Sequence, residues 1–94
     1  MAEKLTDPEI AQRLQGLGGW TRDGGAIRKS FSFGTFADGI RFVDRVALEA
    51  DALDHHPDVD IRYTTITMVL STHSAGGLTR RDFELAERIE RAVR

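Results

Sequence analysis

The chain contains three histidines, and they are grouped rather than scattered. His55 and His56 are adjacent at the end of a long helical pattern, and His73 follows the last strand pattern. An imidazole has an ordinary pKa of about 6.5, so it can both give and take a proton near neutral pH. If the two connections meet at one end of the fold, three imidazoles share a site suited to general acid–base catalysis.

Charges around these residues favour the imidazolium form. The C-terminal end of a helix carries partial negative charge, and the carboxylates of Asp51, Asp54 and Asp58 add to it. We therefore expect at least one of the three histidines to stay partly protonated at neutral pH and to act as a general acid.

Spacing alone leaves two other interpretations open. Adjacent histidines at a helix end are more often capping or surface residues than catalysts. Three histidines could also ligate zinc, but His55 and His56 point in different directions as neighbours, and the i, i+4 pairing of helical zinc sites is absent. Without cysteines, thiol catalysis and thiolate metal sites are excluded. Composition and spacing therefore favour catalysis only modestly over a structural role.

Other residues that could carry chemistry have simpler explanations. Asp82 lies at the third position of a predicted helix, where capping explains a carboxylate. Trp20 follows two glycines and is expected to pack. The pair Arg80-Arg81 at a helix start opposes the helix dipole, which we attribute to solvent or a partner surface.

The composition fits one domain spanning residues 1–94, with a net charge of −2 and 40% hydrophobic residues. Lys and Arg number 13 against 15 Asp and Glu, so no nucleic-acid partner is expected. The longest apolar runs fall far short of the ~20 residues of a membrane span, and the first residues lack the features of a signal peptide. We expect a cytoplasmic protein with no membrane partner.

Three capping boxes, each a threonine followed three residues later by an acidic residue, predict where three helices begin. The helices are expected from Thr6 to about Leu17, from Thr35 to about Asp54 and from Thr79 onward. Alternating patterns predict strands at residues 20–22, 27–33, 59–63 and 66–72, with turns at 23–25 and 63–65 and a loop at 74–77. The order α-β-β-α-β-β-α predicts an α+β fold, a four-stranded antiparallel sheet with three helices packed on one face.

Apolar residues predict which side of each element is buried. On the strand at 27–33, Lys29 interrupts the inner face, so we expect it to lie at an edge or to reach out along its stem. The band on the middle helix is wide enough to indicate burial by the sheet and by another subunit. Its main stripe is Phe36, Ile40, Val43, Ala47 and Ala50, widened by Phe42, Val46 and Leu53. The predicted buried face of the last helix is Phe83, Ala86, Ile89 and Val93.

Several motifs together resemble the pterin-4a-carbinolamine dehydratase family. They are Asp54-His55-His56-Pro57-Asp58, Tyr63, Leu70-Ser71-Thr72-His73 and Gly77-Leu78-Thr79 followed by Asp82. The resemblance extends to Gly19-Trp20, Ala26-Ile27, Phe31, Phe33 and Val46-Ala47-Leu48, so it covers nearly the whole chain. The family's fold, three helices on a four-stranded antiparallel sheet, agrees with the predicted element order.

The resemblance implies an enzyme, a hydro-lyase without cofactor or metal. Its substrate would be the 4a-hydroxytetrahydropterin left by an aromatic amino acid hydroxylase, and loss of water would give quinonoid dihydropterin for tetrahydrobiopterin recycling. The residues that match the essential histidines are His55, His56 and His73, with His55 and His73 as candidate acids on the leaving hydroxyl and His56 contacting N5 or orienting the substrate. The residues that match substrate-binding positions are Trp20, Asp51, Pro57, Thr72, Ser74 and Asp82.

The resemblance also implies partners and two further roles. Family members assemble as homodimers through sheet edges and as homotetramers through helices, and a hydroxylase is a candidate partner. Some members serve as dimerisation cofactors of a homeodomain transcription factor, so the chain could instead be a non-catalytic interaction module or a pterin-binding scaffold. A role in pterin handling for molybdenum cofactor enzymes would share the same site.

Overall fold

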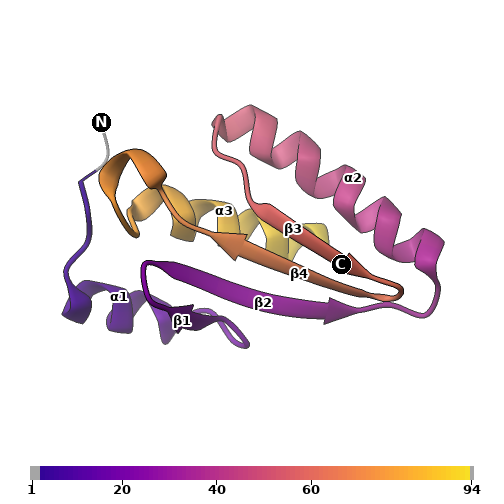
Figure 1. The fold of residues 1–94 in the computed structure, drawn as a ribbon, viewed down its shortest axis with the longest axis horizontal. Coiled ribbons are helices and arrows are strands. Elements are labelled where there is room, and N and C mark those ends of the chain that lie inside the picture. Colours follow the sequence, from indigo (N-terminus) through magenta and orange to yellow (C-terminus); the bar gives the residue numbers. More distant parts are fainter. Residues whose placement is uncertain (1–2, 94) are drawn as a thin grey trace.

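The structure, a computed structural model, describes residues 3–93 and confirms the expected order of helices and strands (Figure 1). The four strands form one antiparallel sheet in the order β1-β2-β4-β3. Within residues 3–93, no helix has both the length and the apolar character needed to cross a membrane. The elements are α1 (Asp7–Leu14), β1 (Thr21–Asp23), β2 (Ala26–Ser32), α2 (Phe36–Leu53), β3 (Asp58–Arg62), β4 (Thr65–Leu70), the 3₁₀ turn η1 (His73–Ala75) and α3 (Arg80–Ala92).

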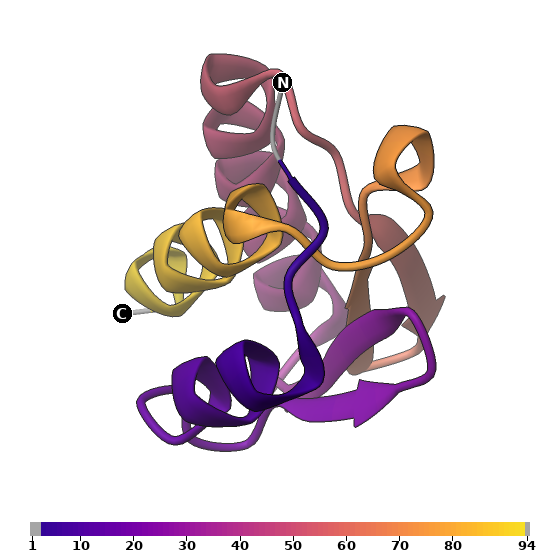
Figure 2. The same ribbon diagram turned by 90° about the vertical axis from the view of Figure 1, so that its left-hand side faces the viewer.

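The three helices lie on the same side of the sheet, as Figure 2 shows. On β2, Ile27 and Phe31 face them and are buried, whereas Arg28, Ser30 and Ser32 on the other face are exposed, as the alternation predicts. Edge strand β3 is exposed along its whole length. The buried inner-face residues of the two central strands are Ile27, Phe31, Ile66, Met68 and Leu70.

Lys29 lies on the inner face and reaches out along its stem, one of the two expected solutions. Its ammonium group donates to the carboxylate of Glu90 at 2.7 Å and to the carbonyl of Gly18 at 2.8 Å. The methylene stem of Lys29 crosses apolar surface, and its ammonium group pairs with the carboxylate of Glu90. The interruption of the alternating pattern therefore leaves no unpaired cation.

The buried side of α2 differs from the predicted stripe. Phe36 is 49% exposed and Ala47 is exposed, whereas Phe42 and Val46 are buried. The reason is close packing at Gly39, where an added Cβ would lie 3.4 Å from the side chain of Ile66. The face that carries Gly39 therefore turns toward the sheet. Ala50 is buried as predicted, whereas the other four residues of the predicted main stripe lie at the margin of the buried face.

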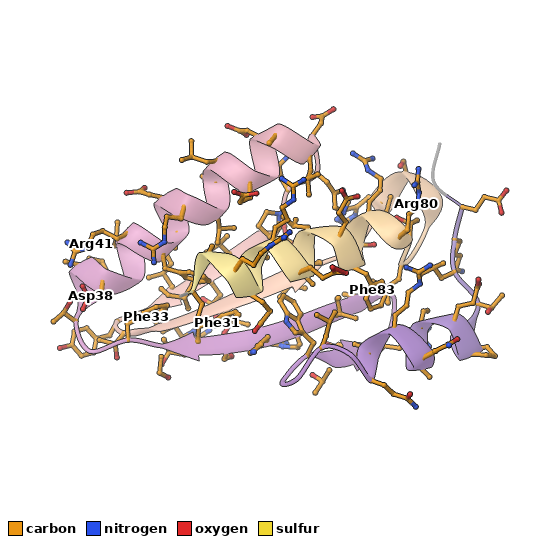
Figure 3. All side chains as sticks on the ribbon, turned by 180° about the vertical axis from the view of Figure 1, so that it is seen from behind. Phe31, Phe33, Asp38, Arg41, Arg80 and Phe83 are labelled. Atoms are coloured by element: carbon orange, nitrogen blue, oxygen red, sulfur yellow. The ribbon has the colours of Figure 1, made fainter. Side chains whose placement is uncertain are left out.

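The predicted helix starts are largely confirmed. Reciprocal capping boxes join Thr6 to Glu9 and Thr79 to Asp82. At Thr35 the hydroxyl accepts the N–H of Asp38, whose carboxylate pairs with Arg41 one turn further along α2 (Figure 3). Other boundaries shift by one to three residues: α1 ends at Leu14, β4 ends at Leu70, and β1, β2 and β3 are each displaced by one residue. The loop predicted at 74–77 overlaps the turn η1. Val93 follows α3 and is 37% exposed, so it does not extend the buried face.

Acid is expected to loosen the first turns of α1 and α2. The pKa of Glu9 is lowered by the backbone N–H of Thr6, and the pKa of Asp38 is lowered by the side chain of Arg41. A carboxylate with a lowered folded-state pKa stabilises the fold above its unfolded pKa, and this stabilisation is lost as pH falls through the folded value. Amide protection factors, which are exchange rates normalised to the intrinsic rate, should therefore fall in these turns below about pH 4 before the sheet opens. The variant Glu9→Gln should remove the pH dependence at α1 only.

Candidate functional site

The end of α2 places two adjacent histidines in different environments. Asp54 caps the helix in the left-handed conformation, with φ at 50°, so the chain leaves the helix axis just before His55. The backbone N–H of His55 then donates to the carbonyl of Ala50 at 3.1 Å. His55 is buried, with 8% of its surface exposed, whereas the side chain of His56 is 56% exposed. The two rings thus diverge, as expected for neighbours.

Asp82 is the buried centre of the site. Its Oδ1 atom lies 2.6 Å from Nε2 of His55. Its Oδ2 atom accepts hydrogen bonds from the hydroxyl of Thr72 at 2.8 Å and from the backbone N–H of Thr79 at 2.9 Å. Because Thr72 directly precedes His73, one carboxylate joins the segment after α2, the segment after β4 and the start of α3.

The direction of these hydrogen bonds assigns the protons. An ionised carboxylate only accepts, so Nε2 of His55 donates to Asp82. The hydroxyl of Thr72 also donates to Asp82, and the hydroxyl of Thr79, 2.9 Å away, therefore donates to Thr72. Within residues 3–93, no buried side-chain nitrogen or oxygen lacks a partner. The ring nitrogen of His55 that remains for proton exchange with a bound molecule is Nδ1.

His56 forms a second, exposed pair. Its Nε2 atom lies 2.9 Å from Oδ1 of Asp51, whose side chain is 76% exposed. A pair this open to solvent contributes little to folding stability. It holds one ring nitrogen of His56 and leaves the ring at the surface.

His73 opens the turn η1 and is exposed. Its Nε2 atom lies 3.5 Å from the hydroxyl of Ser71, too far for a strong hydrogen bond, so the ring is weakly held. The turn itself is closed by the N–H of Thr72, which donates to the carbonyl of Gly77 at 3.0 Å. Figures 1 and 2 both place η1 at the same end of the molecule as the end of α2. The two connections therefore lie at the same end of the molecule, which a shared histidine site requires.

Two further residues from the sequence analysis lie on these same connections. Pro57 directly follows His56 and is half-buried, and Ser74 directly follows His73 and is exposed. Neither side chain belongs to the buried network around Asp82.

Trp20 lies away from the histidines within this chain. It is buried, and its indole N–H donates to the carboxylate of Glu90 at 2.9 Å. Glu90 follows Asp82 by eight residues on α3, which corresponds to about 12 Å along the helix axis. Its packing agrees with the structural expectation for Trp20, and the structure does not bring it to the imidazoles.

Two residues of the site were missed by the sequence analysis. Thr79 was recognised only as a helix cap, yet its backbone N–H and hydroxyl both belong to the network around Asp82. Arg81 was assigned to solvent or a partner, yet its guanidinium group donates to the carbonyls of Leu53 and Asp54. The unfavourable charge of Arg81 at a helix start was the one signal in the sequence that pointed to such a contact.

The fold and site define an α+β domain with three imidazoles at one end, one of them backed by a buried carboxylate. Such a site is equipped for proton transfer. In the part of the chain that the structure describes, no three His, Asp or Glu side chains are grouped so that they could hold a metal ion.

Comparisons with known proteins identify the family. The family model described as pterin 4 alpha carbinolamine dehydratase matches residues 3–92. The chain is 52% identical to a Mycobacteroides abscessus protein named as a pterin-4-alpha-carbinolamine dehydratase, over 95% of each chain. It is 52% identical to a relative of the same name from Roseiflexus castenholzii, over 99% of this chain and 100% of the relative. The chain belongs to the pterin-4a-carbinolamine dehydratase family, which is named for a hydro-lyase activity.

Solved structures agree with this assignment. A Brucella melitensis structure described as a transcriptional coactivator/pterin dehydratase is 33% identical and superimposes with a TM-score of 0.94, over 98% of this chain and 100% of that one. A pterin dehydratase-like protein described as a RuBisCO assembly factor in the alpha-carboxysome is 20% identical, with a TM-score of 0.64 over 79% of this chain and 86% of that one. At this identity the second similarity shows the fold alone.

Proposed function

We propose that the chain dehydrates 4a-hydroxytetrahydropterin to quinonoid dihydropterin and so serves tetrahydrobiopterin recycling. In this reaction the bond from C4a to the hydroxyl oxygen breaks, and that oxygen takes a proton and leaves as water. N5 loses its proton, and a double bond forms between N5 and C4a. The observation that carries the proposal is the shared carboxylate of Asp82, which ties His55 to the segment of His73.

The proton inventory of the site matches this chemistry. One group must deliver a proton to the leaving hydroxyl, and another must accept the proton from N5. His55 can deliver a proton only from Nδ1, because Nε2 is committed to Asp82. The carboxylate then balances the imidazolium charge and fixes the ring. We assign His55 and His73 to the leaving hydroxyl and His56 to N5 or to substrate orientation.

The remaining site residues divide by burial. Asp51, Pro57 and Ser74 reach the surface beside the histidines and are proposed to contact the pterin. Thr72 and Asp82 are 4% and 0% exposed, so we place them behind the rings, where they act on the substrate through His55 and His73. Trp20 is proposed to support the site indirectly through the core, where its ring packs edge-on against that of Phe31.

Stopped-flow absorbance of hydroxypterin decay tests the function. Replacing His55, His56 or His73 with alanine should each slow dehydration by about 10²–10⁴-fold, the usual contribution of a general acid or base. Ser32→Ala, on the exposed outer face of β2, should leave the rate unchanged. Wild-type protein that decays the substrate no faster than buffer would overturn the proposal. So would three alanine variants that all retain the wild-type rate.

Exposed apolar residues support self-association and keep a binding role open. Val59 and Ile61 on edge strand β3 are each 40% exposed, and Leu48 on α2 is 71% exposed. We propose dimers through the β3 edge and tetramers through α2. Sedimentation at micromolar concentration should show a dimer or tetramer, with Ile61→Lys disrupting the sheet contact and Leu48→Glu the helix contact. A strict monomer would contradict this assembly.

An interaction module is the second candidate function. It would use the exposed face of α2, which does not include the histidines. His73→Ala distinguishes the two functions, since an enzyme loses dehydration whereas a helix-mediated adaptor keeps its partner.

A further inference from the structure

Arg81 reaches from α3 to the end of α2, directly before the two adjacent histidines. Its guanidinium group donates to the carbonyl of Asp54 and, at 3.4 Å, to the carbonyl of Leu53. We infer that Arg81 is a positioning residue that holds the segment carrying His55 and His56 for catalysis. This inference rests on the proposed dehydratase function.

The end of α2 lacks the charge that a helix C-terminus favours. Its last turn reads Ala50-Asp51-Ala52-Leu53 and contains no basic residue, and the capping residue Asp54 is acidic as well. The last carbonyls of a helix have no partners within the helix and carry partial negative charge. Arg81 therefore provides, from another helix, both a cation and hydrogen-bond donors for these carbonyls.

The position of Arg81 is unfavourable for its own helix. It is the second residue of α3, where the partial positive charge of the helix start repels a cation. The start of α3 is stabilised instead by Thr79 and by the carboxylate of Asp82. The placement of Arg81 is thus explained by what it does at α2 and not by what it does for α3.

Arg81 and Asp82 are consecutive, and both bind the short segment of residues 53–55. Arg81 binds the main chain of residues 53–54, while Asp82 binds the ring of His55. The two contacts differ in kind, because one fixes the backbone and the other fixes a side chain. Asp54, which directly precedes His55, has the left-handed backbone conformation, which few non-glycine residues adopt without support. Loss of the guanidinium should free this backbone and misplace both rings.

The experiment compares Arg81→Met with Arg80→Met and Arg81→Lys. Arg80 is the exposed neighbour at the start of α3 (Figure 3), so it matches Arg81 in charge and in sequence position. With 4a-hydroxytetrahydropterin, Arg81→Met should lower kcat by about 10–100-fold and leave KM within about threefold, since small displacements of catalytic groups affect the chemical step most. Arg81→Lys should recover part of kcat through its single ammonium, and Arg80→Met should match the wild type.

A second readout follows the rings directly. Proton–nitrogen correlation spectra of the imidazoles should show the Nε2 proton of His55 protected by Asp82 in the wild type and in Arg80→Met. In Arg81→Met this proton should exchange with solvent at least several-fold faster, at a temperature well below Tm. A variant whose Tm falls while kcat and the His55 signal stay unchanged would overturn the inference, because Arg81 would then only stabilise the fold. If the wild type shows no dehydration, the proposed function fails, and the spectra alone decide whether Arg81 holds the ring.

Discussion

Asp82→Asn should slow dehydration by about 10²–10⁴-fold while the domain stays folded. The substitution keeps the size of the side chain but replaces one acceptor oxygen with an NH₂ donor. The remaining oxygen can still accept from Thr72 and Thr79, so the capping of α3 is retained. The new donor then faces Nε2 of His55, which in the wild type is itself a donor.

The two facing donors are accommodated when the proton of the His55 ring moves from Nε2 to Nδ1. His55 becomes an acceptor at Nε2 and carries its proton on Nδ1, so the atom that faces the substrate has the opposite role in the neutral ring. The charge that balanced an imidazolium is also lost. Stability should fall by only about 1–3 kcal/mol, the range for a weakened buried hydrogen-bond network. The large effect is expected in catalysis, not in folding.

Ring nitrogen chemical shifts of His55 provide the decisive measurement, because they distinguish a proton on Nε2 from one on Nδ1. Glu9→Gln is the matched control, since Glu9 holds the same third position in an exposed capping box on α1. It should shift Tm less than Asp82→Asn and leave the dehydration rate unchanged. An Asp82→Asn protein with the wild-type rate and an unchanged His55 tautomer would contradict the assigned proton positions.

The parts of the site that could be predicted from sequence are those with a local signature. Capping boxes mark the starts of α1 and α3, and the end of α2 follows from Pro57. The histidines stand out by residue type. The network around Asp82 could not be derived from spacing, because local capping fully explains a carboxylate at that position. Its bond to His55 spans 27 residues and exists only once α2 and α3 have packed.

The same limit applies to the buried side of α2. Its apolar residues extend so far around the helix that the pattern is compatible with more than one orientation. The choice is made by Gly39, which lets the helix approach Ile66 closely, and by Phe42, whose ring packs at a tilt against those of Phe31 and Phe33. Both contacts depend on residues outside α2, namely Ile66, Phe31 and Phe33. The periodicity of one helix therefore predicts the presence of a buried face more reliably than it predicts the residue at the centre of that face.

Phe42→Ala should destabilise the domain by about 3–5 kcal/mol, the usual loss for a buried phenylalanine. Phe42 has no exposed surface, and its ring centroid lies 5.0 Å from that of Phe31 and 5.1 Å from that of Phe33. For a domain of this size, each kcal/mol lowers Tm by about 4–8 °C, so the midpoint should drop by at least about 12 °C. Urea unfolding followed by circular dichroism measures the free energy of unfolding, and a thermal melt gives the midpoint.

Phe36→Ala is the matched control, the same substitution about 1.7 turns earlier on α2. Phe36 is 49% exposed, so its loss should change the free energy of unfolding of the monomer by less than about 1 kcal/mol. Monomeric conditions are those in which the unfolding midpoint does not depend on protein concentration. At concentrations where the chain self-associates, a larger effect of Phe36→Ala would show that this residue is covered by a second subunit. Equal losses for both variants under monomeric conditions would place Phe36 in the core, and the orientation of α2 described above would be wrong.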